Sequence, residues 1–161
     1  MTDLSHASAA RLLAAADIDA VIAIDRAHSG HVRRRFLATR LAAAEDRPAD
    51  FVGVGVERGG ALCAFAVVRL LPGMADPAQR VGVLEAIGVA ERPDAHRASA
   101  CLVEALSRMM RARGVRVLHS QVDWEDEDLL HFLEGTDCEL VPRLALERRL
   151  AERLREPCKA S

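Results

Sequence analysis

The sequence of 161 residues is poor in aromatic side chains, which make up 3% of it, and it contains no tyrosine. Any mechanism that requires a tyrosine hydroxyl is therefore excluded. No apolar stretch approaches the roughly 18 uninterrupted residues that a membrane-spanning helix requires. The first nine residues lack the basic cluster and apolar core of a secretory signal. We therefore expect a cytoplasmic protein without a membrane partner.

Neither the cysteines nor the charge balance indicates a metal or nucleic-acid partner. Cys63, Cys101, Cys138 and Cys158 include no pair with Cys-x-x-Cys spacing, so we expect buried, reduced side chains and no metal site. The formal net charge is −2, which lacks the basic footprint of a nucleic-acid-binding protein. Half of the residues are apolar and 29% are charged, which is typical of a globular protein.

The length fits one domain, which we expect to span residues 1–150, followed by a tail over 151–161. A chain of this size buries roughly 70% of the surface that its unfolded form exposes, so its core needs neither disulfides nor metal. The sequence leaves open whether the tail is a short helix or disordered.

The spacing of apolar residues changes along the chain and predicts alternating strands and helices. Asp17 is expected to cap the first helix, and Arg58-Gly59-Gly60 is a hairpin turn signal. The predicted strands cover 9–13, 51–57, 61–71, 80–90, 115–122, 138–141 and 144–147, and the predicted helices cover 18–27, 31–45, 99–113 and 126–134.

This order of elements predicts an α/β (α+β) fold. The consecutive strands form hairpins, and the later strand-helix-strand unit makes a parallel pair. We therefore expect a mixed, mostly antiparallel sheet with helices on both faces.

Two segments carry a resemblance to a known family. Residues 87–106, IGVAERPDAHRASACLVEAL, align without a gap to the pattern IGVxPxxRGxGIGxxLLEAL of the GNAT N-acetyltransferase superfamily, and residues 122–140 also resemble a family segment. Together with the element order, the resemblance covers about residues 9–149. It implies an acetyl-CoA-dependent N-acetyltransferase that acts on a small-molecule or peptide amine. A homodimer is one assembly found in the family.

The resemblance implies a place for acetyl-CoA. The strand over residues 83–89 splays from the strand over 115–122, its backbone pairs with the pantetheine arm, and the following helix start binds the pyrophosphate. The positions carried over as cofactor-binding are Ile87, Gly88, Val89, Ala95, His96, Arg97, Ala98, Ser99 and Ala100, with Asp126 at the position of a family asparagine.

The sequence departs from the family at the phosphate-binding segment. No glycine lies between Val89 and Gly114, and Asp94 and Arg97 stand where the family has a donor and a glycine. Three alternatives follow: the side chain of Arg97 or His96 replaces the missing amide contacts, the segment is re-registered, or the cofactor affinity is reduced.

Leu133 stands where many family members have a tyrosine acid. Water, backbone donors or another side chain then assist the leaving thiolate. The alternative function is a catalytically silent GNAT-fold protein that binds a ligand or a partner.

Glu85 and Asp123 are the candidate catalytic residues. In the family, a carboxylate on the strand that holds Glu85 acts as the base for the amine. We expect Glu85 to share an apolar face with Val83, Ile87 and Val89, or else to be satisfied by an arginine. Asp123 ends the splayed strand within the acidic run DWEDED. This run either attracts a cationic amine or is a solvated loop and helix start, where acidic residues suit the helix dipole.

The segment between the first two predicted helices has alternative interpretations. By resemblance, His28 and His31 belong to the acceptor wall, whereas from composition alone they are a surface pair. The run of Arg33, Arg34 and Arg35 is either an anion-binding patch or a solvated helix face.

Overall fold

The fold is built on a five-stranded sheet in the order β1-β2-β3-β4-β5. In this computed structural model, residues 8–73, 76–122, 125–142 and 146–147 are described. The strands are β1 (Ala9–Leu12), β2 (Phe51–Arg58), β3 (Ala61–Pro72), β4 (Arg80–Val89) and β5 (Val115–Ser120). The first three pairings are antiparallel and the β4–β5 pairing is parallel. The predicted mixed, mostly antiparallel sheet is confirmed.

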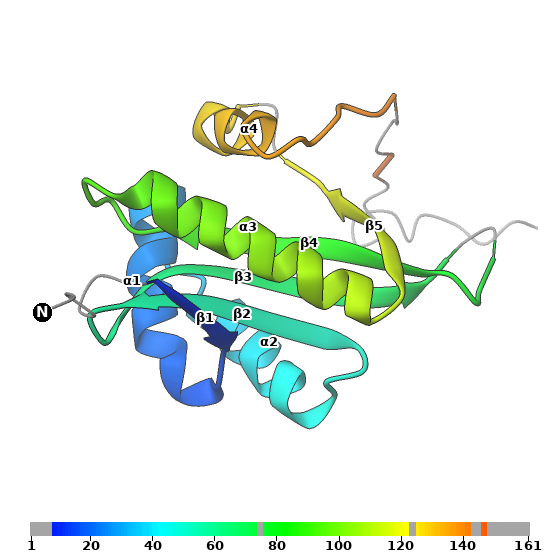
Figure 1. The fold of residues 1–161 in the computed structure, drawn as a ribbon, viewed down its shortest axis with the longest axis horizontal. Helices are drawn as coiled ribbons and strands as arrows, with labels where there is room; N and C mark the ends of the chain where they lie inside the picture. Colours follow the sequence, from blue (N-terminus) through cyan, green and yellow to red (C-terminus); the bar gives the residue numbers. More distant parts are fainter. Residues whose placement is uncertain (1–7, 74–75, 123–124, 143–145, 148–161) are drawn as a thin grey trace, which may run out of the picture.

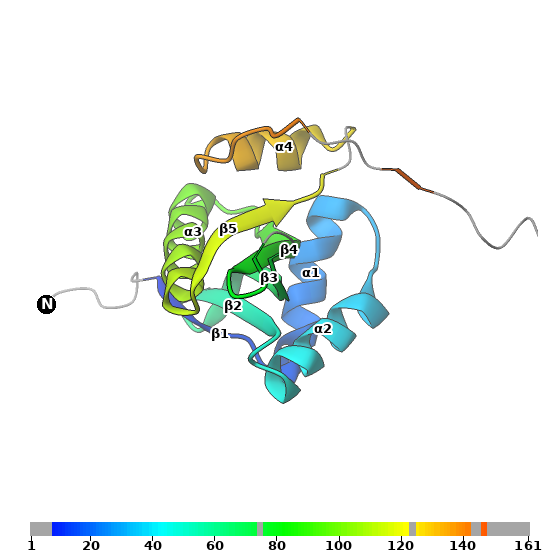
Figure 2. The same ribbon diagram turned by 90° about the vertical axis from the view of Figure 1, so that its right-hand side faces the viewer.

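Helices cover both faces of the sheet, as predicted (Figures 1 and 2). The short 3-10 helix η2 (Ala15–Asp17) leads into α1 (Ile18–Ser29), and α1 and α2 (Arg34–Asp46) lie on one face. The long helix α3 (Ala95–Ala112) lies on the other face. Figure 2 shows α4 (Glu127–Glu134) beyond β5. No helix within the described residues is both long and apolar enough to cross a membrane.

The core consists of two apolar clusters, one on each side of the sheet. The cluster under α3 includes Leu102 and Val68, and the cluster under α1 and α2 includes Leu37, Phe65 and Val67. Strand β3 contributes to both clusters because it lies in the middle of the sheet. This position explains its nearly continuous apolar sequence, since a strand that is buried on both faces needs no polar alternation.

Glycine alternates with valine in β2 because one face of this strand has space for side chains and the other face does not. The valines pack into the cluster under α3. On the other face, a Cβ atom on Gly55 would lie 2.6 Å from Leu13 and 2.7 Å from Leu62. Leu13 therefore lies against the glycine backbone, which a larger residue would block.

Strand β4 contains a β-bulge at Glu85. Val68 on β3 faces Leu84, and the neighbouring Val67 faces Ala86, so Glu85 is an extra residue on β4. As a result, Leu84 packs under α3 while Ala86 packs under α1 and α2. Residues two apart on a regular strand would share a face.

The predicted start of the long helix and the predicted cap of the first helix are wrong. Helix α3 begins at Ala95 rather than at residue 99, so the segment expected as a loop forms the first turns of the helix. Asp17 makes no side-chain cap bond within the described residues. Its carboxylate accepts instead from the Ala14 N–H at 2.8 Å and pairs with Arg11.

The C-terminal strands also differ from the prediction. Residues 138–141 form no strand, and the side chain of Leu140 is 85% exposed. The predicted strand over 144–147 lies partly outside the described residues.

The cysteines follow the expectation in part. Cys63 is buried, its thiol donates to the Val56 carbonyl at 3.2 Å, and burial raises the pKa of this thiol. Cys101 is half-buried, but Cys138 is exposed, so the expectation of burial is wrong there. Cys158 lies outside the described residues.

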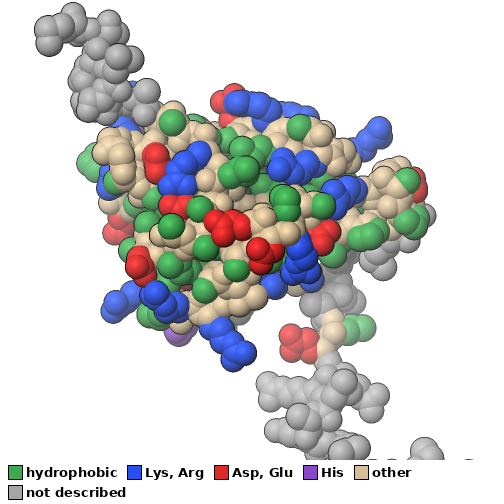
Figure 3. Space-filling model, turned by 90° about the horizontal axis from the view of Figure 1, so that it is seen from below, with side chains coloured by type: hydrophobic (Ala, Val, Ile, Leu, Met, Phe, Trp, Pro, Cys, Tyr) green, Lys and Arg blue, Asp and Glu red, His purple; other side chains and the backbone are tan. Residues whose placement is uncertain are grey.

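Charges of both signs are interspersed on the face seen from below in Figure 3. Acidic and basic side chains lie between apolar ones on this face, rather than in a patch of one sign. This arrangement matches the small net charge of the chain.

The core under α3 gives a direct test of the fold. Leu102 is fully buried, so Leu102→Ala should lower the free energy of unfolding by about 2–5 kcal/mol through lost burial and a residual cavity. Leu140→Ala is the control, since that side chain is exposed, and it should change the value by less than about 0.5 kcal/mol. Urea denaturation measures both. Equal effects of the two substitutions would contradict the packing described here.

Candidate active site

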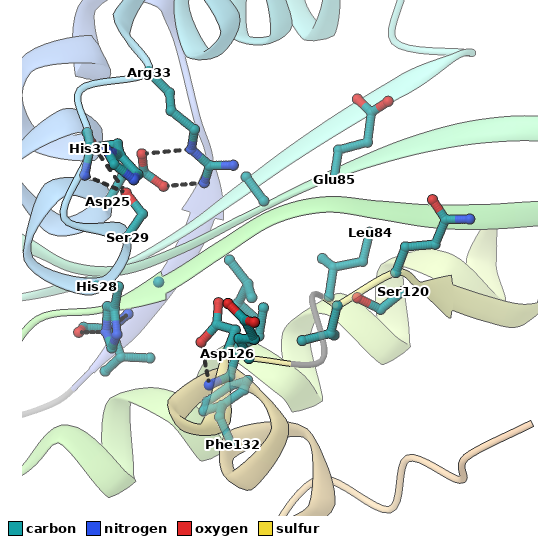
Figure 4. A pocket seen from close by; sticks show the side chains of 18 residues that line it. Asp25, His28, Ser29, His31, Arg33, Leu84, Glu85, Ser120, Asp126 and Phe132 are labelled. Atoms are coloured by element: carbon teal, nitrogen blue, oxygen red, sulfur yellow. Dashed lines mark hydrogen bonds and ion pairs between the residues drawn. The ribbon is translucent and has the colours of Figure 1, made fainter. Parts of the chain in front are cut away.

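A cavity opens where β4 and β5 stop pairing. The parallel pairing runs from Arg80 with Val115 to Leu84 with Ser120, and β4 then continues to Val89 without a β5 partner in the described register. A cavity of about 590 Å³ lies at this point, between β4, the end of β5, the end of α1 and the start of α4 (Figure 4). Its volume is within the range of small-molecule sites, roughly 300–1,000 Å³.

The structure brings one group of the sequence-predicted site residues to this β4–β5 cavity. Glu85, Ile87, Gly88 and Val89 line it from β4, and Asp126 lines it from the N-terminus of α4. The Asp126 carboxylate accepts a hydrogen bond from the Leu129 N–H at 3.1 Å and thereby caps α4. Asp123 lies outside the described residues.

The predicted positions on α3 do not line the cavity. Ala98 is buried in the core under α3, and Ala95 and Ser99 are half-buried. His96, Arg97 and Ala100 are exposed on the first turns of the helix. The structure therefore separates these residues into a helix-start group that is distinct from the cavity.

Three amides at the start of α3 donate to backbone carbonyls. The Arg97 and Ala98 N–H groups donate to the Asp94 carbonyl at 3.0 and 3.4 Å, and the Ala95 N–H donates to Arg92. The Asp94 carboxylate forms an ion pair with Arg58. An anion at this end of the helix would thus rely on the exposed Arg97 side chain more than on these amides.

Glu85 has a charged environment, so the expectation of an apolar face is wrong. Its carboxylate lies 2.5 Å from Arg40 Nε and 3.2 Å from Arg69 Nε, and its side chain is 11% exposed. The bulge is the physical reason, because it turns Glu85 toward α2 and away from the face of Ile87 and Val89. Figure 4 shows Glu85 and Leu84 pointing in opposite directions. The alternative of a glutamate satisfied by arginine is what the structure contains.

His28 contacts the end of β4. Its Nε2 atom lies 2.5 Å from the Val89 carbonyl oxygen and 3.2 Å from the Val89 nitrogen. One neutral ring nitrogen either donates to the carbonyl or accepts from the N–H, according to its tautomer. The imidazole therefore engages one of the two Val89 backbone groups at the open end of the strand.

A buried ion pair forms another part of the wall and was missed by the sequence analysis. Asp25 on α1 is 2% exposed. Its carboxylate accepts from Arg33 Nε at 3.0 Å and from Arg33 Nη2. This hydrogen bonding raises the pKa of the Arg33 guanidinium, while burial acts in the opposite direction. The signal in the sequence was a charge at Asp25 on the apolar side of the helix, four residues after the buried Val21.

Comparison with known proteins establishes the fold. No protein-family model and no curated protein sequence matches the chain. Its structure is similar to a ribosomal-protein-alanine N-acetyltransferase from Brucella melitensis biovar Abortus 2308, with a TM-score of 0.70 and 20% identity over 89% of this chain and 100% of that one. It is also similar to the aminoglycoside N-acetyltransferase AAC(6')-Iy in complex with CoA, with a TM-score of 0.68 and 16% identity over 93% and 99% of the two chains.

A third similar structure is an aminoglycoside acetyltransferase from an uncultured soil metagenomic sample in complex with sisomicin, with a TM-score of 0.64 and 14% identity over 88% and 97%. The chain thus has the fold of the GNAT-type N-acetyltransferases, as the resemblance predicted. The position of the family tyrosine, Leu133, packs against the core under α3. Within the described residues, no three His, Cys, Asp or Glu side chains are grouped to hold a metal ion.

The contact between His28 and Val89 can be tested without any ligand. His28→Ala removes the ring from the Val89 backbone, so the Val89 amide should exchange with solvent roughly tenfold faster or more. Hydrogen exchange followed by NMR measures this rate. His31→Ala, on the same cavity wall, is the control and should leave it unchanged. An unaltered rate in His28→Ala would show that the ring does not protect this amide.

Proposed function

We propose that the protein is an acetyl-CoA-dependent N-acetyltransferase that transfers an acyl group to a primary amine by direct attack. The observation that carries this proposal is the end of β4, which has no β5 partner among the described residues and borders a cavity beside this parallel strand. Two similar structures are described as complexes with CoA or with a CoA-linked bisubstrate analog. The same fold and an open strand edge support a thioester cosubstrate here.

The edge of β4 suits an extended, amide-containing arm. Beyond Leu84 the strand is not paired with β5, and Ile87, Gly88 and Val89 all line the cavity. Backbone N–H and C=O groups need partners when they are buried, and the amides of a pantetheine arm supply such partners. At Val89 the arm would displace the His28 ring, which engages one of those groups in the present structure.

The pyrophosphate of the cosubstrate would lie at the start of α3. This end of a helix favours anions, but the Asp94 carboxylate and its ion pair with Arg58 already occupy part of it. Arg97 is exposed on the first turn and carries the five N–H donors of a guanidinium. We therefore assign to Arg97 the phosphate contacts that glycine amides make in the family.

In the proposed reaction, the amine nitrogen attacks the thioester carbonyl carbon, a C–N bond forms and the C–S bond breaks. The thiolate leaves and takes up a proton, and the amine loses one. We assign the base to Glu85, which lies among the residues lining the cavity. Because its carboxylate faces Arg40 and Arg69, the proton reaches it through a water molecule.

Cosubstrate binding is the first test of this proposal. Titration calorimetry of CoA and acetyl-CoA should give dissociation constants in the micromolar range. Arg97→Glu should weaken binding at least tenfold, or about 1.4 kcal/mol, because it replaces a phosphate donor by an anion. Arg111→Glu, exposed on the last turn of the same helix, should have no effect. Absence of binding at millimolar CoA would reject the proposed acetyltransferase function and favour a catalytically silent binding protein.

The role of Glu85 is tested by thiol release from acetyl-CoA in the presence of a panel of amino acids, polyamines, aminoglycosides and peptides. Glu85→Gln should lower kcat by a factor of about 100 or more, because the amide cannot take up the proton of the amine. CoA affinity should stay unchanged. Glu57→Gln is the matched control, since Glu57 on β2 also pairs with an arginine, Arg11. A Glu85→Gln enzyme with normal kcat and reduced thermal stability would make this carboxylate purely structural.

A further inference from the structure

Arg33 lines the β4–β5 cavity, and only some of its N–H donors form hydrogen bonds within the described residues. Its Nε and Nη2 atoms donate to the two oxygens of Asp25. No residue in the described part of the chain accepts a hydrogen bond from Nη1, and the side chain is 39% exposed. Figure 4 shows the third guanidinium nitrogen turned away from Asp25. The end of the fork formed by Nη1 and Nη2 therefore keeps N–H donors for a ligand.

The buried carboxylate fixes this arginine before any ligand arrives. Asp25 is almost fully buried, and an unpaired buried charge is strongly destabilising, so the ion pair with Arg33 is constrained. The guanidinium also lies 5.5 Å from the centre of the Phe36 ring. A side chain that is already held loses little conformational freedom on binding. The neighbouring Arg34–Asp19 pair differs, since its side chains are 60% and 81% exposed.

A negative group faces the same cavity from another element. Asp126, at the N-terminus of α4, lines the cavity, and its charge contributes to the raised pKa of Arg33. The cavity thus has the guanidinium of Arg33, paired with Asp25, on the α1–α2 side and the Asp126 carboxylate on the α4 side. This pattern is complementary to a small molecule that carries both a carboxylate and an ammonium group.

We propose that the acceptor amine belongs to a molecule that also carries a carboxylate, as in an amino acid, and that Arg33 binds this carboxylate. The planar edge of a guanidinium matches a carboxylate with two parallel hydrogen bonds. Arg33 would touch the substrate, and Asp25 would be a positioning residue that acts through it. This inference rests on the proposed function, which it makes more specific.

The test uses ligands that need neither cosubstrate nor turnover. N-acetyl amino acids resemble the product, and their C-terminal amides differ only by lacking the carboxylate. NMR titrations with the N-acetyl derivatives of alanine, glutamate, lysine and phenylalanine should show saturable shifts of the Arg33 and Gly88 amides for at least one acid. The matching amide should bind at least tenfold more weakly. Equal binding of acid and amide, or no saturable shift with any acid, would overturn the proposal.

Two variants separate carboxylate binding from folding. Arg33→Lys keeps a positive charge beside Asp25 but lacks the planar fork. The double variant Asp25→Asn with Arg33→Gln replaces the ion pair by two neutral amides and leaves no lone buried charge. Both should reduce the preference for the acid to less than twofold, and Arg34→Gln should retain it. Thermal unfolding verifies that each variant is folded. Retention of the preference in the folded Arg33 variants would exclude Arg33 as the carboxylate ligand.

CoA titrations of the same samples distinguish this inference from the proposed function. If the Arg33 variants bind CoA normally but no longer prefer the acid over its amide, both the carboxylate site and the proposed function are supported. If Arg33→Lys instead weakens CoA binding and leaves the acid preference intact, Arg33 contacts the cosubstrate and the inference fails. If the wild-type protein binds the acids but no CoA, the carboxylate site stands and the transferase function fails.

Discussion

The geometry of the site depends on the β-bulge at Glu85. The pairing of β4 with β5 ends at Leu84, the residue immediately before the bulge, so the two strands separate where the extra residue is inserted. The bulge also exchanges the faces of β4, since Leu84 packs under α3 and Ala86 packs under α1 and α2. The inserted residue thus lies where the two strands separate, and it sets the face on which Glu85 lies.

Arginine neutralises both carboxylates that the fold withdraws from solvent near the cavity. Asp25 pairs with Arg33, and Glu85 lies between Arg40 and Arg69. Arg40 also stacks on Phe36 and Phe51, at 5.1 and 5.4 Å from the ring centres. The two ion clusters differ in the polar atoms that remain available to a ligand. Both Glu85 oxygens face guanidinium groups, whereas one end of the Arg33 guanidinium is not engaged by the described residues. That difference makes Arg33 the better candidate for direct contact with a substrate.

Local periodicity predicted most of the elements along the chain, because the two-residue and 3.6-residue patterns of apolar side chains are set by burial. The order of these elements then predicted a mixed sheet with helices on both faces. The periodicity did not predict the features that depend on contacts between residues far apart in the sequence. The bulge at Glu85 has no signal in the alternation of VLEAIGV, and the contact of His28 with Val89 joins residues 61 positions apart. Residues 138–141 have the composition of a strand but form none, since strand formation also requires a partner edge. Asp25 was detectable in principle, as a charge within an apolar helix stripe.

The start of α3 lacks the glycines of the family pattern and has other contacts in their place. The helix begins at Ala95, and the Ala95, Arg97 and Ala98 amides donate to backbone carbonyls. The Asp94 carboxylate pairs with Arg58 at the same end of the helix, so a negative charge already occupies the region where the helix dipole favours anions. In the proposed transferase, the cosubstrate would therefore be held mainly by the open edge of β4 and by exposed guanidinium groups. On this proposal, the chain keeps the strand edge of the family site, and side-chain charge replaces the contacts at the helix start.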